Sequence, residues 1–238
     1  MIDERVLSYP SDIYDRLVDL GLHEHASVVD LACGTGRASF PLISNGFAVT
    51  GVDDATTLLA RAKADFPTAT WRDASPENTG LHSESYDVVV SADALHRFNM
   101  QKCVDEAARI LRPGGVFAAW WRSQMSEDPL SDECIATAKD CGFEWPSSGL
   151  VRGFREFYAA PMLQYQVLRV IPWRTTSRLS EIVADEIARP EIIERCKGGT
   201  DLYAKRLKKR LTTRFGEGNP YLGRAYLIYM YSGNRPTA

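Results

Sequence analysis

Apolar and polar residues follow two alternating patterns through the first half of the chain. Short apolar runs typical of buried strands are separated by stretches whose apolar residues recur every three or four positions, as on one face of a helix. The runs predict strands at 28–32, 47–52, 68–72, 86–91 and 116–121. The other stretches predict helices at 11–20, 37–44, 55–64 and 101–111. Strands that alternate with helices in this way indicate a parallel, doubly wound α/β sheet.

The alternation of strands and helices ends after Trp121, and residues 122–162 are largely irregular. Two late strands are expected at 165–173 and 221–231. Three more helices are expected at 131–141, 179–187 and 201–215. Late strands that bracket helices are typical of an antiparallel edge on a parallel sheet. We therefore expect a mostly parallel, seven-stranded sheet with an antiparallel C-terminal edge and a small helical and irregular cap.

The stretch from Val28 to Arg37 is apolar at first and then small and glycine-rich. This pattern predicts a buried strand that enters a tight turn, with a helix beginning near Arg37. Glycine at 34 and 36 removes the Cβ atoms that would keep a ligand away from the backbone. A strand, turn and helix of this kind form the place where nucleotides bind in an open α/β sheet.

Several kinds of nucleotide could bind at such a strand–turn–helix. A P-loop needs Lys-Ser or Lys-Thr after its second glycine, and the chain has neither there. A dinucleotide fingerprint needs a third small residue, where this chain has Ser39, and an acid such as Asp53 would suit the ribose of NAD. The dinucleotide interpretation therefore remains open.

Further motifs follow the glycine turn in a fixed order. They are Asp30–Gly36, Gly51–Asp54, Arg72–Ala74, Tyr86–Ser91 and Arg109–Gly115. Together they resemble the motifs of class I S-adenosylmethionine-dependent methyltransferases, which have a Rossmann-like fold. The resemblance implies that S-adenosylmethionine is the cofactor and that the following residues bind it: Asp30, Ala32, Cys33, Gly34, Gly36, Asp53, Asp54, Asp73, Ala74, Ser91 and Ala92.

The resemblance also implies a role for the acids at the strand ends. Asp53 would accept both ribose hydroxyls as charge-assisted hydrogen bonds, and Asp73 would face the adenine amino group. Backbone carbonyls of the glycine turn would meet the cofactor's ammonium. An acid that caps a turn or a helix is the alternative interpretation for both aspartates. Cys33 stands where a small residue is needed, and no basic neighbour in the sequence would make its thiol reactive.

Ala94-Leu95-His96-Arg97-Phe98 narrows the resemblance. It is similar to the Ala-Leu-His-Trp-Phe signature of the trans-aconitate methyltransferase-like group (methyltransferase type 11/25), with Arg97 in place of tryptophan. Tyr9-Pro10 resembles the entry segment of the same group. The resemblance implies one methyltransferase domain over 1–238, with a cofactor-binding core at 1–121 and substrate-cap insertions at 122–162 and 174–219.

This group implies in-line methyl transfer to a small molecule, most simply O-methylation of a carboxylate or hydroxyl. N- or C-methylation of a natural-product intermediate is the alternative. His96 is the candidate catalytic residue, either as a base or as an orienting group, unless it only packs locally. The candidate substrate residues are Tyr9, Trp121, Arg152, Arg155 and Trp173. Of these, the two arginines could clamp a carboxylate.

Composition bears on partners and compartment. The chain has 238 residues, a net charge of −3 and five cysteines without a C-x-x-C pair, so we expect no metal site. The acidic start and the short apolar runs predict neither a secretory signal nor a membrane span, and we expect a cytoplasmic protein. A basic helix around 205–210 leaves an RNA-modifying methyltransferase as an alternative. A catalytically silent cofactor-binding module is another.

Overall fold

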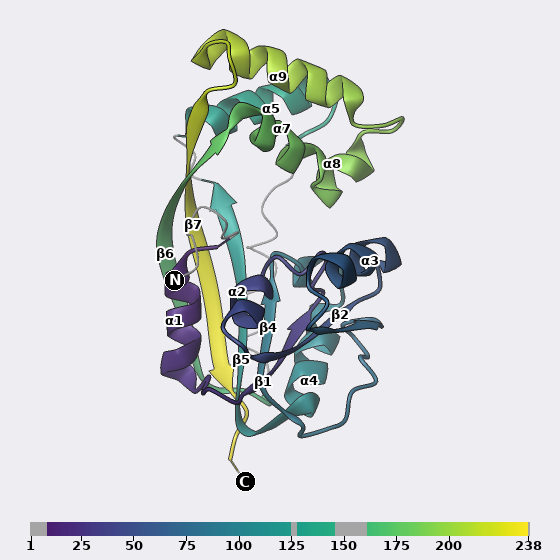
Figure 1. Cartoon of the computed structure of the whole chain (residues 1–238), viewed down its shortest axis with the longest axis vertical. Coiled ribbons are helices and arrows are strands. Elements are labelled where there is room, and N and C mark those ends of the chain that lie inside the picture. The colour runs from purple at the N-terminus through teal and green to yellow at the C-terminus, as the bar shows by residue number, and fades with distance from the viewer. Residues whose placement is uncertain (1–8, 125–127, 146–160, 238) are drawn as a thin grey trace. The chain divides into compact units, whose positions relative to one another are not determined.

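The computed structural model describes residues 9–124, 128–145 and 161–237 (Figure 1). Within them the strands form one seven-stranded sheet in the order β3-β2-β1-β4-β5-β7-β6. The bounds are β1 Ser27–Leu31, β2 Ala48–Asp53, β3 Thr70–Asp73, β4 Tyr86–Ala92, β5 Leu111–Gln124, β6 Gln164–Arg178 and β7 Tyr221–Asn234. The expected doubly wound fold with its C-terminal antiparallel edge is confirmed.

The strand pairing places the carboxyl ends of the first five strands at one edge. β1 pairs in parallel with β2 and with β4, so that Asp30 lies between Gly51 and Val90. β2 pairs in parallel with β3, and β4 with β5. The strand order reverses between β1 and β4, and ligands of open α/β sheets bind outside the carboxyl ends at such a switch point. The direction changes at β7, whose arrow opposes that of β5 in Figure 1.

The helices follow the expected periods, with differences at their ends. They are α1 Ser11–Leu20, α2 Phe40–Ser44, α3 Thr56–Asp65, α4 Met100–Ile110, α5 Pro129–Asp140, α7 Leu179–Ile187, α8 Pro190–Arg195 and α9 Asp201–Phe215. The helix expected from residue 37 begins only at Phe40, because 34–39 form the turn and Pro41 stands in the first helical turn. The short α8 and a 3-10 turn, η2 (Leu95–Arg97), were not expected.

β5 is longer than the expected 116–121. It begins directly after α4, and its register against β4 shifts between Tyr86 and Val88. The end of the Arg109–Gly115 motif lies at this irregular start, where Gly114 has a φ of +81°. Gly114 donates to the carbonyl of Arg235 and Arg235 donates to that of Gly115, both at 2.9 Å, so the reciprocal pair fixes the shift.

The described chain divides into two compact units. The first holds the described residues of 1–122, 149–171 and 228–238, and the second those of 123–148 and 172–227. The first unit has a core around Val29, Val89 and Phe117. The second has its own core, in which α5, α7 and α9 bury leucines, isoleucine and Tyr203. The predicted division into a core and two substrate-cap insertions stays a prediction.

Among the described residues, no helix combines the length and the apolar character that crossing a membrane requires.

Candidate functional site

The turn after β1 is held in an unusual backbone conformation. Ala32, Gly34 and Gly36 all have positive φ, at +56°, +55° and +80°. A left-handed conformation costs a non-glycine residue such as Ala32 about 1–2 kcal/mol. Cys33 donates to the carbonyl of Val52 at 3.1 Å and accepts from the amide of Gly36 at 2.9 Å, which closes the turn. Strain of this kind persists only where neighbouring structure holds it, and it is common at ligand sites.

Asp53, at the carboxyl end of β2, supports this turn. Its side chain is only 6% exposed. One carboxylate oxygen accepts from the Gly34 amide at 2.8 Å and the other from the Ala55 amide at 2.9 Å. The carboxylate therefore joins the glycine turn to the start of α3. Each carboxylate oxygen has a second lone pair, so these two bonds leave it able to accept from a ligand.

Asp30 lies within the sheet, directly before the turn, and is fully buried. The hydroxyl of Ser39 donates to one of its oxygens at 2.5 Å. The other oxygen has no hydrogen-bond partner among the described residues. Burial raises the pKa of Asp30 to about 7; the Ser39 hydrogen bond opposes this rise and the nearby charge of Asp53 adds to it. An orphaned buried acceptor beside a glycine turn fits a cationic ligand group.

Trp71 on β3 explains two of the nearby glycines. A Cβ on Gly36 would come within 2.5 Å of the indole, and one on Gly51 within 2.3 Å of it. Gly51 is the cross-strand neighbour of Trp71. A Cβ on Gly34 would meet no atom closer than 4.0 Å, the distance to a methyl group of Leu58. Packing against the indole thus requires glycine at 36 and 51, while Gly34 is the glycine with an accessible backbone.

The remaining predicted cofactor residues lie at the same edge. Asp73 is exposed, aligns with Asp53 in the parallel register, and precedes Ala74, whose amide donates to the Asp53 carbonyl at 3.1 Å. Asp54 is exposed, and Ala92 is half-buried at the end of β4. The hydroxyl of Ser91 donates to the Leu31 carbonyl at 2.7 Å and is buried. The structure therefore gives Ser91 a role in joining β4 to β1.

Cys33 is buried beside Asp30 and Asp53. Burial raises the pKa of its thiol far above the usual range, and the two carboxylates raise it further. A thiol that stays protonated is a poor nucleophile. This agrees with a packing role for Cys33.

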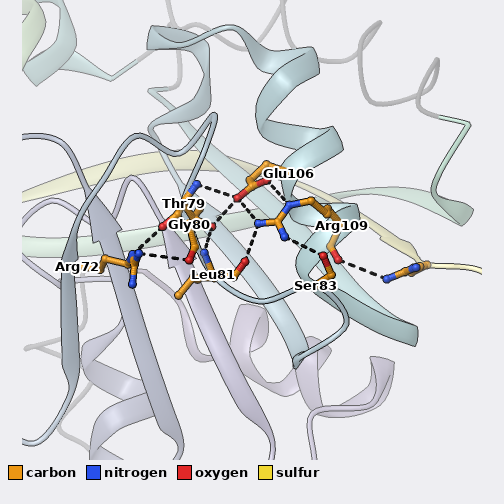
Figure 2. Close-up of polar contacts among 8 residues, drawn as sticks. Arg72, Thr79, Gly80, Leu81, Ser83, Glu106 and Arg109 are labelled. Carbon is orange, nitrogen blue, oxygen red and sulfur yellow. Dashed lines mark hydrogen bonds and ion pairs between the residues drawn. The ribbon is translucent and has the colours of Figure 1, made fainter.

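The loop at 75–84, which follows Asp73 and Ala74, is fastened to α4 by a polar network (Figure 2). Glu106 is buried and accepts from the amide and the hydroxyl of Thr79 at 2.8 and 2.5 Å. Arg109 binds Glu106 through two nitrogens and also donates to the Leu81 carbonyl at 2.8 Å. Arg72 reaches the same loop from β3 and donates to the Thr79 carbonyl at 2.7 Å. The network holds the segment that follows β3.

Replacing Glu106 with glutamine is expected to destabilise the fold by about 2 kcal/mol, because hydrogen bonds to a charged group are worth about 1.5–3 kcal/mol. Burial would raise the pKa of Glu106, but bonds from Arg109 and Thr79 outweigh it, so the pKa is lowered overall. The stabilisation is thus present above the unfolded pKa and lost as pH falls through the folded one. Urea unfolding at neutral pH measures the loss, which should shrink in acid. Asp105→Asn, on the exposed side of the same helix, is the matched control and should change stability by less than about 0.5 kcal/mol.

His96, on η2 after the carboxyl end of β4, contacts Trp121, which lies within β5. The Trp121 indole nitrogen donates to Nδ1 of His96 at 3.2 Å. Trp121 is 3% exposed and packs in the core of the first unit, while His96 is half-buried on η2. Two predicted site residues far apart in the sequence are thus brought into contact.

Tyr9 lies in another cluster of the first unit. Its hydroxyl donates to Asp93 at 2.9 Å, and Arg122 binds Asp93 through its backbone amide and its Nε, at 2.7 and 2.6 Å. The Arg122 guanidinium lies 5.0 Å from the centre of the Tyr9 ring. Sequence reasoning missed Asp93 and Arg122. The position of Asp93 two residues after a predicted strand, where the chain leaves the sheet, was the available signal.

Of the other predicted substrate residues, the structure describes Trp173. Trp173 belongs to the second unit and stacks on Tyr226 with ring centres 5.4 Å apart. Arg152 and Arg155 lie outside the described residues. In the second unit, Arg224 and Glu186 form a buried ion pair at 2.8 Å.

The basic helix α9 uses its arginines within the second unit. Arg210 binds Asp140 at 2.6 Å and Glu133 at 3.2 Å, and Arg214 binds Glu133 at 2.8 Å. Arg206 donates to the Asp140 carbonyl. These partners lie on α5, so the arginines serve helix packing. In the part of the chain that is described, no group of three or more histidine, cysteine, aspartate or glutamate side chains could hold a metal ion.

The strand order fits the Rossmann-like methyltransferase fold, and the glycine turn follows β1 while acids end β2 and β3. A family model described as a methyltransferase domain matches residues 29–119. We therefore identify these residues as a class I, S-adenosylmethionine-dependent methyltransferase domain.

Known relatives support this identification. An uncharacterised methyltransferase of Synechocystis sp. is 33% identical over 105 residues, which are 43% of this chain and 50% of that protein. The ubiquinone/menaquinone biosynthesis C-methyltransferase UbiE of Campylobacter jejuni is 29% identical over 126 residues, 47% of this chain and 54% of its own length. The chain thus spans about half the length of the curated relatives it matches.

A solved structure described as a type II methyltransferase from Anaeromyxobacter dehalogenans shares the fold. Its TM-score is 0.70 at 22% identity, with 97% of this chain and 98% of that chain covered. The narrower resemblance to the trans-aconitate methyltransferase-like group is not confirmed by these comparisons and stays a prediction.

Proposed function

We propose that this chain transfers a methyl group from S-adenosylmethionine to a small-molecule acceptor. The observation that carries the proposal is the arrangement around the glycine turn. Asp53 fixes the turn, and the buried Asp30 presents an orphaned oxygen directly before it. Both acids belong to the domain that matches the methyltransferase family model. When bound, the cofactor supplies a methyl group on a positively charged sulfur.

The residues present fit the chemical groups of this cofactor. Asp53 keeps lone pairs for two ribose hydroxyls, and charge-assisted hydrogen bonds of this kind are strong. Asp73, exposed at the end of β3, would accept from the adenine amino group. The orphaned oxygen of Asp30 and the accessible backbone of Gly34 would receive the ammonium. Two acids near one another also favour a ligand with net positive charge.

The acceptor is expected in front of β4 and β5, where His96 lies. We propose O-methylation of a carboxylate or hydroxyl, because His96 can orient an oxygen acceptor and alignment supplies most of the catalysis in a displacement of this kind. C-methylation is the second candidate, because the relative from Campylobacter jejuni is named a C-methyltransferase. The pairing of the α9 arginines with α5 argues against a nucleic-acid acceptor.

Calorimetry and a labelling panel test this proposal. S-adenosylmethionine should bind the purified chain in titration calorimetry, and tritiated methyl should pass to trans-aconitate or benzoate in a panel that also holds catechol, a quinol and total tRNA. Mild alkali releases label from a methyl ester and leaves C-methyl label in place, so it separates the two candidates. A chain that binds no S-adenosylmethionine would refute the cofactor, and label found only on tRNA would refute the small-molecule acceptor.

A further inference from the structure

The five cysteines, none of which is in a disulfide, differ in their accessibility. Cys141 and Cys196 are half-buried. The other three are buried: Cys33, Cys103 and Cys134. Burial raises the pKa of the Cys103 thiol to about 12, and it raises those of Cys33 and Cys134 even further. A thiol reacts as the thiolate and needs access for the reagent, so Cys141 and Cys196 are the candidates for modification.

Cys141 and Cys196 line the same cavity in the second unit. Its volume is about 590 Å³. Cavities of about 300–1,000 Å³ are typical of sites that hold small molecules. Both cysteines also pack against the core that α5, α7 and α9 form. Two thiols from separate parts of the sequence are therefore open to the same small molecule.

The backbone holds the two cysteines with different firmness. The Cys141 amide donates to the carbonyl of Ala138 at 3.0 Å, which continues the hydrogen bonding of α5. Cys196 follows the six-residue α8 and shortly precedes Gly198 and Gly199. These glycines have φ of +116° and +107°, and a Cβ on either would meet no atom within 4 Å. The permissive backbone and the open space let Cys196 adjust toward Cys141, as a disulfide with Cβ atoms about 3.5–4.5 Å apart requires.

The surroundings of the two sulfurs indicate which one reacts first. The Arg206 guanidinium on α9 donates to the Cys141 sulfur at 3.8 Å, and a cation beside sulfur stabilises a thiolate. Burial raises the pKa of Cys196, and the nearby Cys141 raises it further. Cys141 is therefore the attacking thiol, and Cys196 is the thiol that reacts second.

We propose that Cys141 and Cys196 form a dithiol that an anionic small disulfide, such as glutathione disulfide, oxidises to an intramolecular disulfide. The Cys141 thiolate attacks one sulfur of the reagent, whose S–S bond breaks, and one glutathione leaves as a thiolate. The Cys196 thiolate then attacks the Cys141 sulfur and releases the second glutathione. Two electrons pass from the cysteines to the reagent, and the two cysteine protons end on the two glutathione thiols.

The charges that line the cavity favour a reagent that is an anion. Arg195 and Lys197 line it together with a single acid, Glu194. Glutathione disulfide is an anion at neutral pH because its carboxylates outnumber its ammonium groups. The crosslink would join the end of α5 to the end of α8. The proposal concerns the second unit and does not rest on the proposed function.

Mass spectrometry tests the crosslink. The reduced chain, incubated with glutathione disulfide at about pH 8, should lose about 2 Da, the mass of two hydrogen atoms. Digestion should yield one linked pair of peptides, which joins Cys141 to Cys196, and the other three cysteines should alkylate only after denaturation. In Cys196→Ser one glutathione should remain on Cys141. In Cys141→Ser the Cys196 thiol should react at least about tenfold more slowly than Cys141 does in Cys196→Ser. Glutathione on both cysteines without a crosslink, or no reaction at either, would overturn the proposal.

A charge reversal tests the choice of reagent. Lys197→Glu should slow oxidation by glutathione disulfide at least about threefold at low salt, and it should not slow oxidation by cystamine, a small disulfide that is a cation. High salt should shrink the difference. Lys209→Glu makes the same change at an exposed position of α9 and should alter neither rate. A rate with glutathione disulfide that Lys197→Glu leaves unchanged would refute the anionic reagent.

Discussion

Replacing Asp53 with alanine is expected to weaken the binding of S-adenosylmethionine at least tenfold. The carboxylate holds the Gly34 and Ala55 amides and keeps two lone pairs for the ribose hydroxyls. Hydrogen bonds to a charged acceptor are worth about 1.5–3 kcal/mol each, and a tenfold change corresponds to only about 1.4 kcal/mol. Because the ribose is common to substrate and product, S-adenosylhomocysteine should lose affinity by a similar factor. Titration calorimetry with both nucleosides measures the effect.

Two controls make this result interpretable. Glu24→Ala removes the same charge from an exposed position before β1 and should leave both affinities unchanged. Thermal unfolding of Asp53→Ala checks that the domain still folds, although its Tm should fall because two amides lose their acceptor. Unchanged calorimetric affinity in a folded Asp53→Ala variant would show that the cofactor does not use this carboxylate.

The sequence predicts the sheet well because the signal for each strand is local. A buried strand such as β4 appears as a continuous apolar run, and an amphipathic helix such as α9 repeats its leucines at the helical period. Both α7 and α9 are found at the expected bounds. The predicted helix boundaries are wrong where a side chain or a turn determines them. The helix expected from residue 37 begins at Phe40 because the glycine turn precedes it.

The contacts of the candidate site are not predictable in the same way. Thr79 and Glu106 are 27 residues apart, and His96 and Trp121 are 25 apart, so no local pattern links them. The glycine motif shows the limit clearly. Sequence reasoning gives Gly36 the task of admitting a ligand, whereas the structure shows that Trp71 occupies the space where its Cβ would lie. A motif therefore indicates which residues matter before it shows what each one contacts.

Asp30 and Asp53 differ in their hydrogen-bond partners at the glycine turn. Asp53 has two amide donors, so both of its carboxylate oxygens have a hydrogen-bond partner without a ligand. Asp30 has a single donor, Ser39, and one orphaned oxygen in a fully buried position. Its negative charge is therefore the one that a cation would stabilise most. The stability of the chain without cofactor should consequently depend on whether Asp30 is protonated.

Replacing Asp30 with asparagine is expected to remove a decline in stability between about pH 4 and pH 7. The pKa of Asp30 is raised from 3.8 to about 7 in the folded chain, first by burial and then by the charge of Asp53. The folded state thus binds more protons than the unfolded state in this window, so stability falls as pH rises through it. This displacement corresponds to about 4 kcal/mol. At pH 8, Asp30→Asn without cofactor should be more stable than the wild type by up to that amount.

Urea unfolding of both chains at a series of pH values measures this difference. Groups that do not interact with Asp30, such as Glu106, titrate alike in the two chains, so the difference between them isolates Asp30 together with its coupling to Asp53. Asparagine keeps an oxygen to accept from Ser39. Ser39→Ala provides the reverse test, since losing the one donor should raise the pKa of Asp30 further and extend the decline to higher pH. A decline of equal size in the wild type and in Asp30→Asn would show that Asp30 stays charged across this range. The affinity for S-adenosylmethionine should rise with pH only in the wild type, because only there does a cation replace a proton at the orphaned oxygen.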